Sequence, residues 1–300
     1  MALILDFMKL RGKKMEKLLT IGMATYDDYE GVYFSLQALR LYHKLALSDE
    51  VEIVVVDNNP DSEHGKAVKS FVEYWIKNGK YVPYTLRRST AVRNEIFKNA
   101  SGKYCISMDS HVLFFPNALE SLIQYYASDD NVMGCQNIVH GPLIYDDCKS
   151  PSTHFKPEWG GDMYGKWETD HAALKKGKPF EIPMQGLGVF SCETRNWRGF
   201  NKLFKGFGGE EGYIHQKFRQ MGGKAVCVPG FKWMHRFVRP AGVPYPLVLE
   251  DRIWNYFIGW LELTQDENDP MIQAIYDNFK ERIPKQSLDN ILHKAKERIL

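Results

Sequence analysis

The chain has 300 residues, of which 44% are hydrophobic and 25% charged, and its formal net charge is +2. These values are typical of a globular protein with one large domain or two small ones, and they allow a sizeable core. So small a net charge gives no argument by itself for a nucleic-acid or membrane partner, although it leaves room for a local basic patch.

The N-terminal segment 1–14 holds an apolar run that is broken by Asp6 and followed, not preceded, by basic residues. The run is too short to span a bilayer, so we expect neither a signal peptide nor a membrane anchor there, and Met15 could be the functional start. An odd, scattered set of cysteines without a CxxC pair favours reduced thiols and a cytoplasmic protein. The cysteines are Cys105, Cys135, Cys148, Cys192 and Cys227.

Strand-like and helix-like segments alternate through the first half of the chain. The predicted strands are 18–24, 51–56, 81–86 and 104–108, and the predicted helices are 30–46, 62–77 and 90–100. This alternation indicates an α/β fold with a mostly parallel, doubly wound sheet, whose ligands bind beyond the carboxyl ends of the strands. Residues 25–28, Asp57 and Asp109 all follow strands, so we expect them to line one crevice.

The triplet Asp109-Ser110-His111 lies between a predicted buried strand and a helix opened by Pro116. If the extended geometry continues, alternation places Asp109 and His111 on one side and Ser110 on the other. A carboxylate and an imidazole together suit a divalent ion such as Mn²⁺, with open positions for water and phosphate oxygens. A strand-end turn with a polar tip explains the triplet equally well.

The second half has a long aperiodic stretch, and regular patterns return after it. Residues 140–179 follow a predicted strand at 132–139. A stretch of this length without a periodic pattern indicates a functional lid or a disordered insert. Their aromatic residues, Trp159 among them, suit either stacking on a sugar or a satellite hydrophobic cluster. The predicted elements that follow are a regular segment at 181–192, a helix opened by 208–211 and stopped by 222–223, and a strand at 225–228.

Three helical patterns with interspersed charge fill residues 247–300, and we expect them to pack on the main domain. The predicted organisation is therefore an N-terminal extension at 1–14, a catalytic-type α/β domain at 15–246, and a C-terminal helical extension at 247–300.

With these landmarks placed, the chain resembles the GT-A fold glycosyltransferases of the family 2 type, and particularly the catalytic domain of polypeptide N-acetylgalactosaminyltransferases. Order and spacing of several motifs carry the resemblance, which covers roughly residues 17–246. The matching stretches are Met108–His111 for an Asp-Ser-His metal motif, 184–190 for Met-Ala-Gly-Gly-Leu-Phe, 207–211 for Trp-Gly-Gly-Glu-Asn, 221–223 for Cys-Gly-Gly, and 234–237 with Pro244-Tyr245 for Gly-His-Val-Phe-Arg before Pro-Tyr.

The chain also departs from the family pattern. Glu211 replaces the asparagine of the Gly-Gly-Glu-Asn motif, and Val238 stands where the family has an arginine, with Arg236 and Arg239 on either side. The residue that contacts phosphate is therefore open. The membrane anchor and lectin domain of that family have no counterpart in the sequence, so the resemblance implies neither a secretory setting nor a protein acceptor.

The resemblance implies a site for Mn²⁺, or Mg²⁺, and for a UDP-sugar donor. It assigns the metal to Asp109, His111 and His235, although a core position would be the ordinary interpretation of His235 alone. The nucleotide-binding candidates are Thr25, Asp27, Asp57, Arg93, Asp109, Ser110, Arg236, Arg239 and Tyr245. The candidates for the donor sugar or the acceptor are Gly186, Leu187, Gly188, Trp159 and Trp233.

Two carboxylates are the catalytic candidates. Glu210 is expected to contact the donor sugar and Glu211 to act as a base or to contact the acceptor, with the stereochemistry open. Simple compensation of the helix dipole is the alternative for both. Asp57 has an alternative role in an Asx turn, and Arg93 as a solvated cation.

We therefore expect a metal-dependent glycosyltransferase that moves a hexosyl or N-acetylhexosaminyl group to an acceptor hydroxyl. A sugar-phosphate nucleotidyltransferase is less consistent, because Ala24-Thr25-Tyr26-Asp27 is not a glycine-rich phosphate loop. A non-catalytic carbohydrate-binding protein is a third hypothesis. The acceptor stays open between a glycan, a protein and a modified nucleic-acid base; residues that would suit a polyanion are Lys205, Lys232, Trp233, Arg236 and Arg239.

Overall fold

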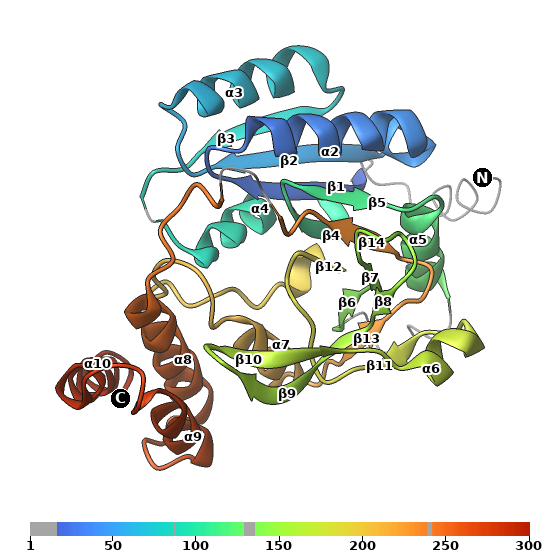
Figure 1. Ribbon diagram of the computed structural model, residues 1–300. Helices are drawn as coiled ribbons and strands as arrows, with labels where there is room; N and C mark the ends of the chain where they lie inside the picture. The colour runs from blue at the N-terminus through green and yellow to red at the C-terminus, as the bar shows by residue number, and fades with distance from the viewer. Residues whose placement is uncertain (1–16, 87, 129–135, 239–241) are drawn as a thin grey trace.

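The structure is a computed structural model that describes residues 17–86, 88–128, 136–238 and 242–300 (Figure 1). The predicted N-terminal extension, the first half of the strand predicted at 132–139, and the candidate Arg239 lie outside these residues.

A central sheet of eight strands organises the described part of the chain, in the order β11-β13-β6-β12-β4-β1-β2-β3. The four strands β1 to β4 run parallel to one another, while β12 pairs antiparallel with β4 and with β6. The predicted α/β architecture with a mostly parallel sheet is thus confirmed. The strand bounds are β1 Lys17–Thr25, β2 Val51–Asp57, β3 Gly79–Pro83, β4 Gly102–Asp109, β6 Ile138–His140, β11 Phe180–Glu181, β12 Val189–Glu193 and β13 Ala225–Cys227.

Helices cover both faces of this sheet, which explains why its central strands carry apolar residues on both faces. Along β2, Ile53 and Val55 belong to one hydrophobic core, and Val54 and Val56 belong to the other. The first core lies under α2, α3 and α5, and the second lies under α4, α7 and the C-terminal helices. The helix bounds are α2 Tyr29–Tyr42, α3 Glu63–Trp75, α4 Arg93–Asn99, α5 Ala118–Ala127 and α7 Glu211–Gln220, with short 3-10 turns η1 Lys44–Leu47, η2 Thr90–Val92 and η4 Thr194–Asn196.

The stretch predicted as a lid or a disordered insert is regular structure, so the expectation of a disordered insert is wrong, while a role as a lid stays a prediction. It contains a hairpin, short strands of a second sheet and a helix. Each of these strands, and the helix, is too short to give a recognisable period in the sequence. The second sheet has the order β5-β14-β7-β8. The bounds are β5 Val112–Phe114, β7 Leu143–Ile144, β8 Pro151–Ser152, β9 His154–Gly160, β10 Met163–Glu168, α6 His171–Lys176 and β14 Trp233–His235.

Three helices follow the last strand: α8 Leu249–Thr264, α9 Pro270–Phe279 and α10 Lys285–Ile299. They supply apolar residues to the second core, among them Phe257, Ile275 and Leu288, and α8 lies against α7 (Figure 1). In the part of the chain that the structure describes, none of the helices combines the length and hydrophobicity that crossing a bilayer requires.

Candidate metal and nucleotide site

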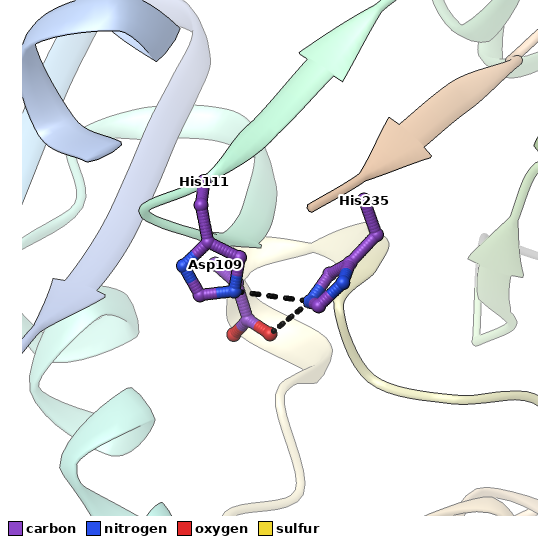
Figure 2. Close-up of side chains that lie close together, drawn as sticks. All are labelled: Asp109, His111 and His235. Carbon is purple, nitrogen blue, oxygen red and sulfur yellow. Dashed lines mark hydrogen bonds and ion pairs between the residues drawn. The ribbon is translucent and has the colours of Figure 1, made fainter. Parts of the chain in front are cut away.

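Three metal-ligand side chains converge where β4 ends. Asp109 is the last residue of β4, His111 lies in the turn before β5, and His235 is the last residue of β14 (Figure 2). Pairing between β5 and β14 places His235 opposite Val112, and the backbone N–H of Arg236 donates to the carbonyl of His111 at 3.2 Å. Two three-residue strands therefore bring together histidines that are 124 positions apart.

The ligand atoms of this cluster lie within 4.8 Å of one another. The Nε2 atoms of His111 and His235 are 3.0 Å apart, and Nε2 of His235 lies 3.5 Å from Oδ2 of Asp109 (Figure 2). The expectation of a continuing strand is wrong, because Ser110 and His111 form a turn. The turn nevertheless keeps the side chains of Asp109 and His111 on one side.

Asp28, in the loop after β1, fixes the orientation of His111. Nδ1 of His111 donates to Oδ2 of Asp28 at 3.0 Å, because an ionised carboxylate can only accept. The Ser110 hydroxyl donates to the same oxygen at 2.7 Å. In the neutral tautomer with the proton on Nδ1, His111 would present the lone pair of Nε2 to the cluster. A carboxylate behind a ligating histidine is a common arrangement in metal sites.

The donor set fits a divalent ion. Two nitrogens bound to one ion at about 2.1 Å, with an angle close to a right angle between them, lie about 3 Å apart, which is the separation observed between the two Nε2 atoms. One carboxylate and two imidazoles form a mixed oxygen and nitrogen set that suits Mn²⁺. Nδ1 of His235 is buried and has no hydrogen-bond partner among the described residues.

Arg93 connects the metal cluster to the carboxylates at the start of α7. It donates to Oδ1 of Asp109 at 2.7 Å and lies 3.8 Å from Oε1 of Glu210. Burial alone would raise the pKa of Asp109, but the Arg93 guanidinium, with help from both histidines, holds that pKa well below its usual range. This shift favours the ionised form of Asp109, which is the form that binds a cation. Arg93 is buried, so its interpretation as a solvated cation is wrong.

Glu210 and Glu211 are both buried, and each has one carboxylate oxygen without a hydrogen-bond partner in the described part of the chain. Burial raises the pKa of both side chains, and for Glu210 the neighbouring Glu211 raises it further while Arg93 opposes the shift. Compensation of a helix dipole does not require two adjacent buried carboxyl groups with raised pKa values. The pair therefore favours a functional role.

A cavity of about 320 Å³ opens beside the metal cluster. Its polar side includes Thr25, Arg93, Asp109, Ser110 and His111, and its other wall includes aromatic residues. Tyr245 lies between Tyr26 and Phe207, with ring centroids at 6.3 and 5.5 Å, and Arg88 lies over the Tyr26 ring.

Three buried hydroxyls in the cavity wall lack hydrogen-bond partners among the residues that the structure describes. They belong to Thr25, Ser89 and Thr90. Because an unpaired buried polar group costs free energy, these atoms point to a polar ligand that supplies the missing hydrogen bonds. Aromatic faces on one side and hydroxyls on the other suit a nucleoside.

The structure does not bring all the predicted residues to the cavity. Asp57 is buried and already accepts hydrogen bonds from Tyr81 and from the backbone N–H of Asn59, so the predicted Asx turn is present. Asp27 accepts from the side-chain amide of Asn59. Arg236 is exposed and is not among the residues that line the cavity. For these three, a role in nucleotide binding stays a prediction.

The two tryptophans predicted to contact a sugar pack against protein. Trp233 is 1% exposed and donates to the carbonyl of Gly141, so direct stacking on a sugar is wrong for it. Trp159 packs against Tyr164, Tyr256 and Phe279, which is the hydrophobic-cluster alternative.

The loop 186–188 lies directly behind the metal cluster. The carbonyl of Gly188 accepts from the backbone N–H of Asp109, and a Cβ at Gly188 would lie only 3.0 Å from the Trp233 ring and 3.2 Å from that of His235. Leu187 is buried in the second core, and Gly186 faces Trp167 and Phe155. Trp233 and Gly188 together hold the His235 ring in place.

Sequence reasoning missed several side chains of the site. The cavity is also lined by Arg88, Ser89 and Thr90, which follow the strand β3. Because ligands of such sheets bind beyond the carboxyl ends of the parallel strands, the sequence could have indicated these three residues. Asp28 could not be found in this way, because nothing in the sequence pairs it with His111.

Comparison with known proteins identifies the family. Residues 20–239 match the model of glycosyl transferase family 2. No curated protein matches the chain at a significant level of sequence similarity.

Solved structures resemble the fold at low sequence identity. GalNAc-T7 with UDP, GalNAc and Mn²⁺ is 15% identical with a TM-score of 0.67 over 96% of this chain, which spans only 57% of GalNAc-T7. TarS 1–349 of S. aureus with UDP-GlcNAc is 12% identical, with a TM-score of 0.59 and coverages of 94% and 82%. The mannosyltransferase PcManGT of Pyrobaculum calidifontis with GDP-Man and Mn²⁺ is 16% identical, with a TM-score of 0.55 and coverages of 98% and 81%.

The family model covers most of the chain, and these structures share its sheet and helix arrangement. The resemblance inferred from the sequence motifs is therefore confirmed, and the chain belongs to glycosyl transferase family 2 and has the GT-A fold.

Proposed function

We propose that the protein is a metal-dependent glycosyltransferase that moves a sugar from a UDP-sugar to an acceptor hydroxyl. The observation that carries this proposal is the cluster of Asp109, His111 and His235 at the edge of a cavity with unpaired hydroxyls. Similar structures contain UDP or GDP-Man with Mn²⁺, or UDP-GlcNAc, which supports a nucleotide-sugar donor.

In this proposal, Asp109, His111 and His235 hold Mn²⁺ or Mg²⁺ next to the donor diphosphate. A bound divalent ion neutralises the negative charge that develops on the departing diphosphate. Arg93 adds a fixed positive charge on the same side, and Ser110 and Tyr245 line the space for the nucleotide. Thr25, Ser89 and Thr90 supply hydrogen-bonding groups to the nucleoside.

The carboxylates at the start of α7 act on the sugars. Glu210, held near Arg93, contacts the donor sugar, and Glu211 accepts the proton of the acceptor hydroxyl as the bond between the anomeric carbon and the nucleotide breaks. A pKa raised by burial suits this role, because a general base works best when its pKa lies near the working pH. The new bond joins the acceptor oxygen to the anomeric carbon, and UDP leaves.

Incubation with a panel of UDP-sugars and GDP-mannose, with Mn²⁺ and with EDTA, tests this function. We expect slow release of UDP from one UDP-sugar even without acceptor, and its loss with EDTA or in Asp109→Ala. Release of pyrophosphate instead of UDP would identify a nucleotidyltransferase, and binding of nucleotide that is indifferent to EDTA would contradict the metal-dependent mechanism.

A further inference from the structure

A second cavity borders α7, the helix that begins at Glu211. Its volume is about 500 Å³, and no residue of it belongs to the first cavity. One wall is a face of α7 that carries Gly212, Gln216 and Arg219, at helical spacing. Gly212 follows Glu211 directly, so the cavity begins one residue from the carboxylate pair.

Two aromatic side chains form a corner of this cavity. Tyr164 of the β9–β10 hairpin and Trp260 of α8 meet edge to face, with an angle of 88° between their rings. A Cβ at Gly212 would lie 3.1 Å from the Tyr164 ring and 3.5 Å from Trp260, so the glycine lets both rings approach the helix. Both aromatic side chains are only partly buried, which leaves surface for a ligand.

Three polar side-chain groups edge this corner. The Tyr164 hydroxyl, the Trp260 indole N–H and the Gln216 side-chain amide make no hydrogen bond to any residue in the described ranges. Apolar faces edged by neutral donors and acceptors match a pyranose ring, which has an apolar face and a rim of hydroxyls.

The charged groups of the cavity are already engaged. The Arg219 guanidinium donates to the backbone carbonyls of Ile182 and Pro183, and Glu181 pairs with Lys224 at 3.0 Å. The cavity therefore offers little to a phosphate or to a polyanion, both of which need free cations. A neutral ligand fits this wall best.

We propose that this cavity binds a neutral pyranose ring of the acceptor, and thus that the acceptor is a saccharide. The assignment rests on the proposed function, in which Glu211 receives the proton of the acceptor hydroxyl. Between the three acceptor classes that the sequence leaves open, the aromatic corner and the uncharged polar tips favour the glycan.

Saturation-transfer NMR and calorimetry on the full chain, with Mn²⁺ and UDP, test this proposal. The probes are cellobiose, chitobiose, maltose and lactose, with a serine-containing peptide and a single-stranded oligonucleotide as the other acceptor classes. We expect at least one disaccharide to bind, and we expect Trp260→Ala and Gln216→Ala each to weaken that binding by about tenfold. Tyr164→Phe, which removes only the hydroxyl, should weaken it by a smaller factor.

Two controls separate this cavity from the donor site and from loss of folding. Trp75→Ala, at an exposed tryptophan of α3, should leave saccharide binding unchanged, and UDP affinity should be unchanged in all four variants. If Trp260→Ala lowers the melting temperature by more than a few degrees, its weaker saccharide binding could result from loss of folding. The Gln216 and Tyr164 variants then test the cavity.

Disaccharide binding that is unaffected by these substitutions would overturn the proposal, as would binding of the peptide or the oligonucleotide alone, or of none of the probes. If the chain binds neither UDP nor Mn²⁺, the proposed function fails separately, and the same saccharide measurements without nucleotide still support or overturn the assignment of the cavity.

Discussion

The Nε2 atoms of His111 and His235 lie 3.0 Å apart. The pairing of β5 with β14 that brings the two histidines together is only three residues long. Each histidine also has a support of its own. Asp28 orients the first ring, and Trp233 with Gly188 supports the second. Because each ring has its own support, the site is preorganised for a ligand shared between them.

Loss of His235 tests whether this pair binds metal. His235→Ala should weaken Mn²⁺ binding by about 100-fold, because it removes one ligand of a three-ligand set. Titration of the protein with Mn²⁺, followed by electron paramagnetic resonance, measures this affinity. His293→Ala, at an exposed histidine of α10, is the control and should have no effect. Equal affinity in the two variants would contradict the site.

Replacing Asp28 by asparagine should weaken metal binding without destabilising α2. Asp28 caps α2 by accepting from the N–H of Gly31, and asparagine caps helices as well as aspartate does. Asp28→Asn should therefore keep the melting temperature within about 2 °C, while the loss of charge behind His111 weakens Mn²⁺ binding by about tenfold or more. Calorimetry and thermal unfolding of the same preparation measure both quantities. Unchanged metal affinity would show that Asp28 is only a cap.

A methyl group at Gly188 should displace the ring of His235. The added carbon of Gly188→Ala would lie 3.0 Å from the Trp233 ring and 3.2 Å from His235, so we expect weaker Mn²⁺ binding, by about tenfold. Gly186→Ala is a matched control in the same loop, because its methyl would meet Trp167 and Phe155 instead. Both variants should lose some stability, and a similar loss of metal affinity in both would mean that the whole loop moved.

The unpaired hydroxyl of Thr25 should contribute to nucleotide binding rather than to stability. Thr25→Val should weaken UDP binding by about fivefold to tenfold, since it removes one hydrogen bond, and should not lower the melting temperature. Thr20 on the same strand is the matched control. Its hydroxyl bonds Glu52 and the N–H of Gly102, so Thr20→Val should lower the melting temperature and leave UDP affinity unchanged.

Glu211 should reduce stability at neutral pH. Burial raises the pKa of Glu211 on folding, so its ionised form is less stable in the folded protein than in the unfolded chain. This penalty is absent below the unfolded pKa, at about 4.3, and grows as the pH rises from there through the folded pKa. Glu211→Gln should therefore raise the melting temperature at pH 8 by a few degrees and have little effect at pH 4, while UDP release in the presence of acceptor falls. A stabilisation that is independent of pH would contradict this account.

The sequence predicted the parallel half of the central sheet well, because β1, β2 and β4 are hydrophobic runs of seven to nine residues that can be recognised locally. Val51 to Val56 is apolar on both faces, and the structure places it between two helical layers. The second sheet could not be predicted, since β7 and β8 have two residues each, too few for any period. Its pairing decides where His235 lies, so only resemblance to a family pointed to that residue.

Side-chain roles were harder to predict than elements. Trp159 and Trp233 were both expected to contact a sugar, yet one closes a cluster beside α8 and the other lies beneath a metal-ligand candidate. Burial depends on contacts between segments that are distant in sequence, and residue type alone does not report those contacts. Asp28 was missed for the same reason, because His111, which it contacts, is 83 positions away in the sequence.

The short second sheet has a consequence for how this protein could diverge. Its strands hold both imidazoles, whereas the hairpin of β9 and β10, which lies between them in sequence, carries Tyr164 of the second cavity at the start of β10. Exchanges near the tip of that hairpin, away from the residues Phe155 and Trp167 that pack on the loop 186–188, would therefore alter which molecule is recognised while the metal ligands stay the same.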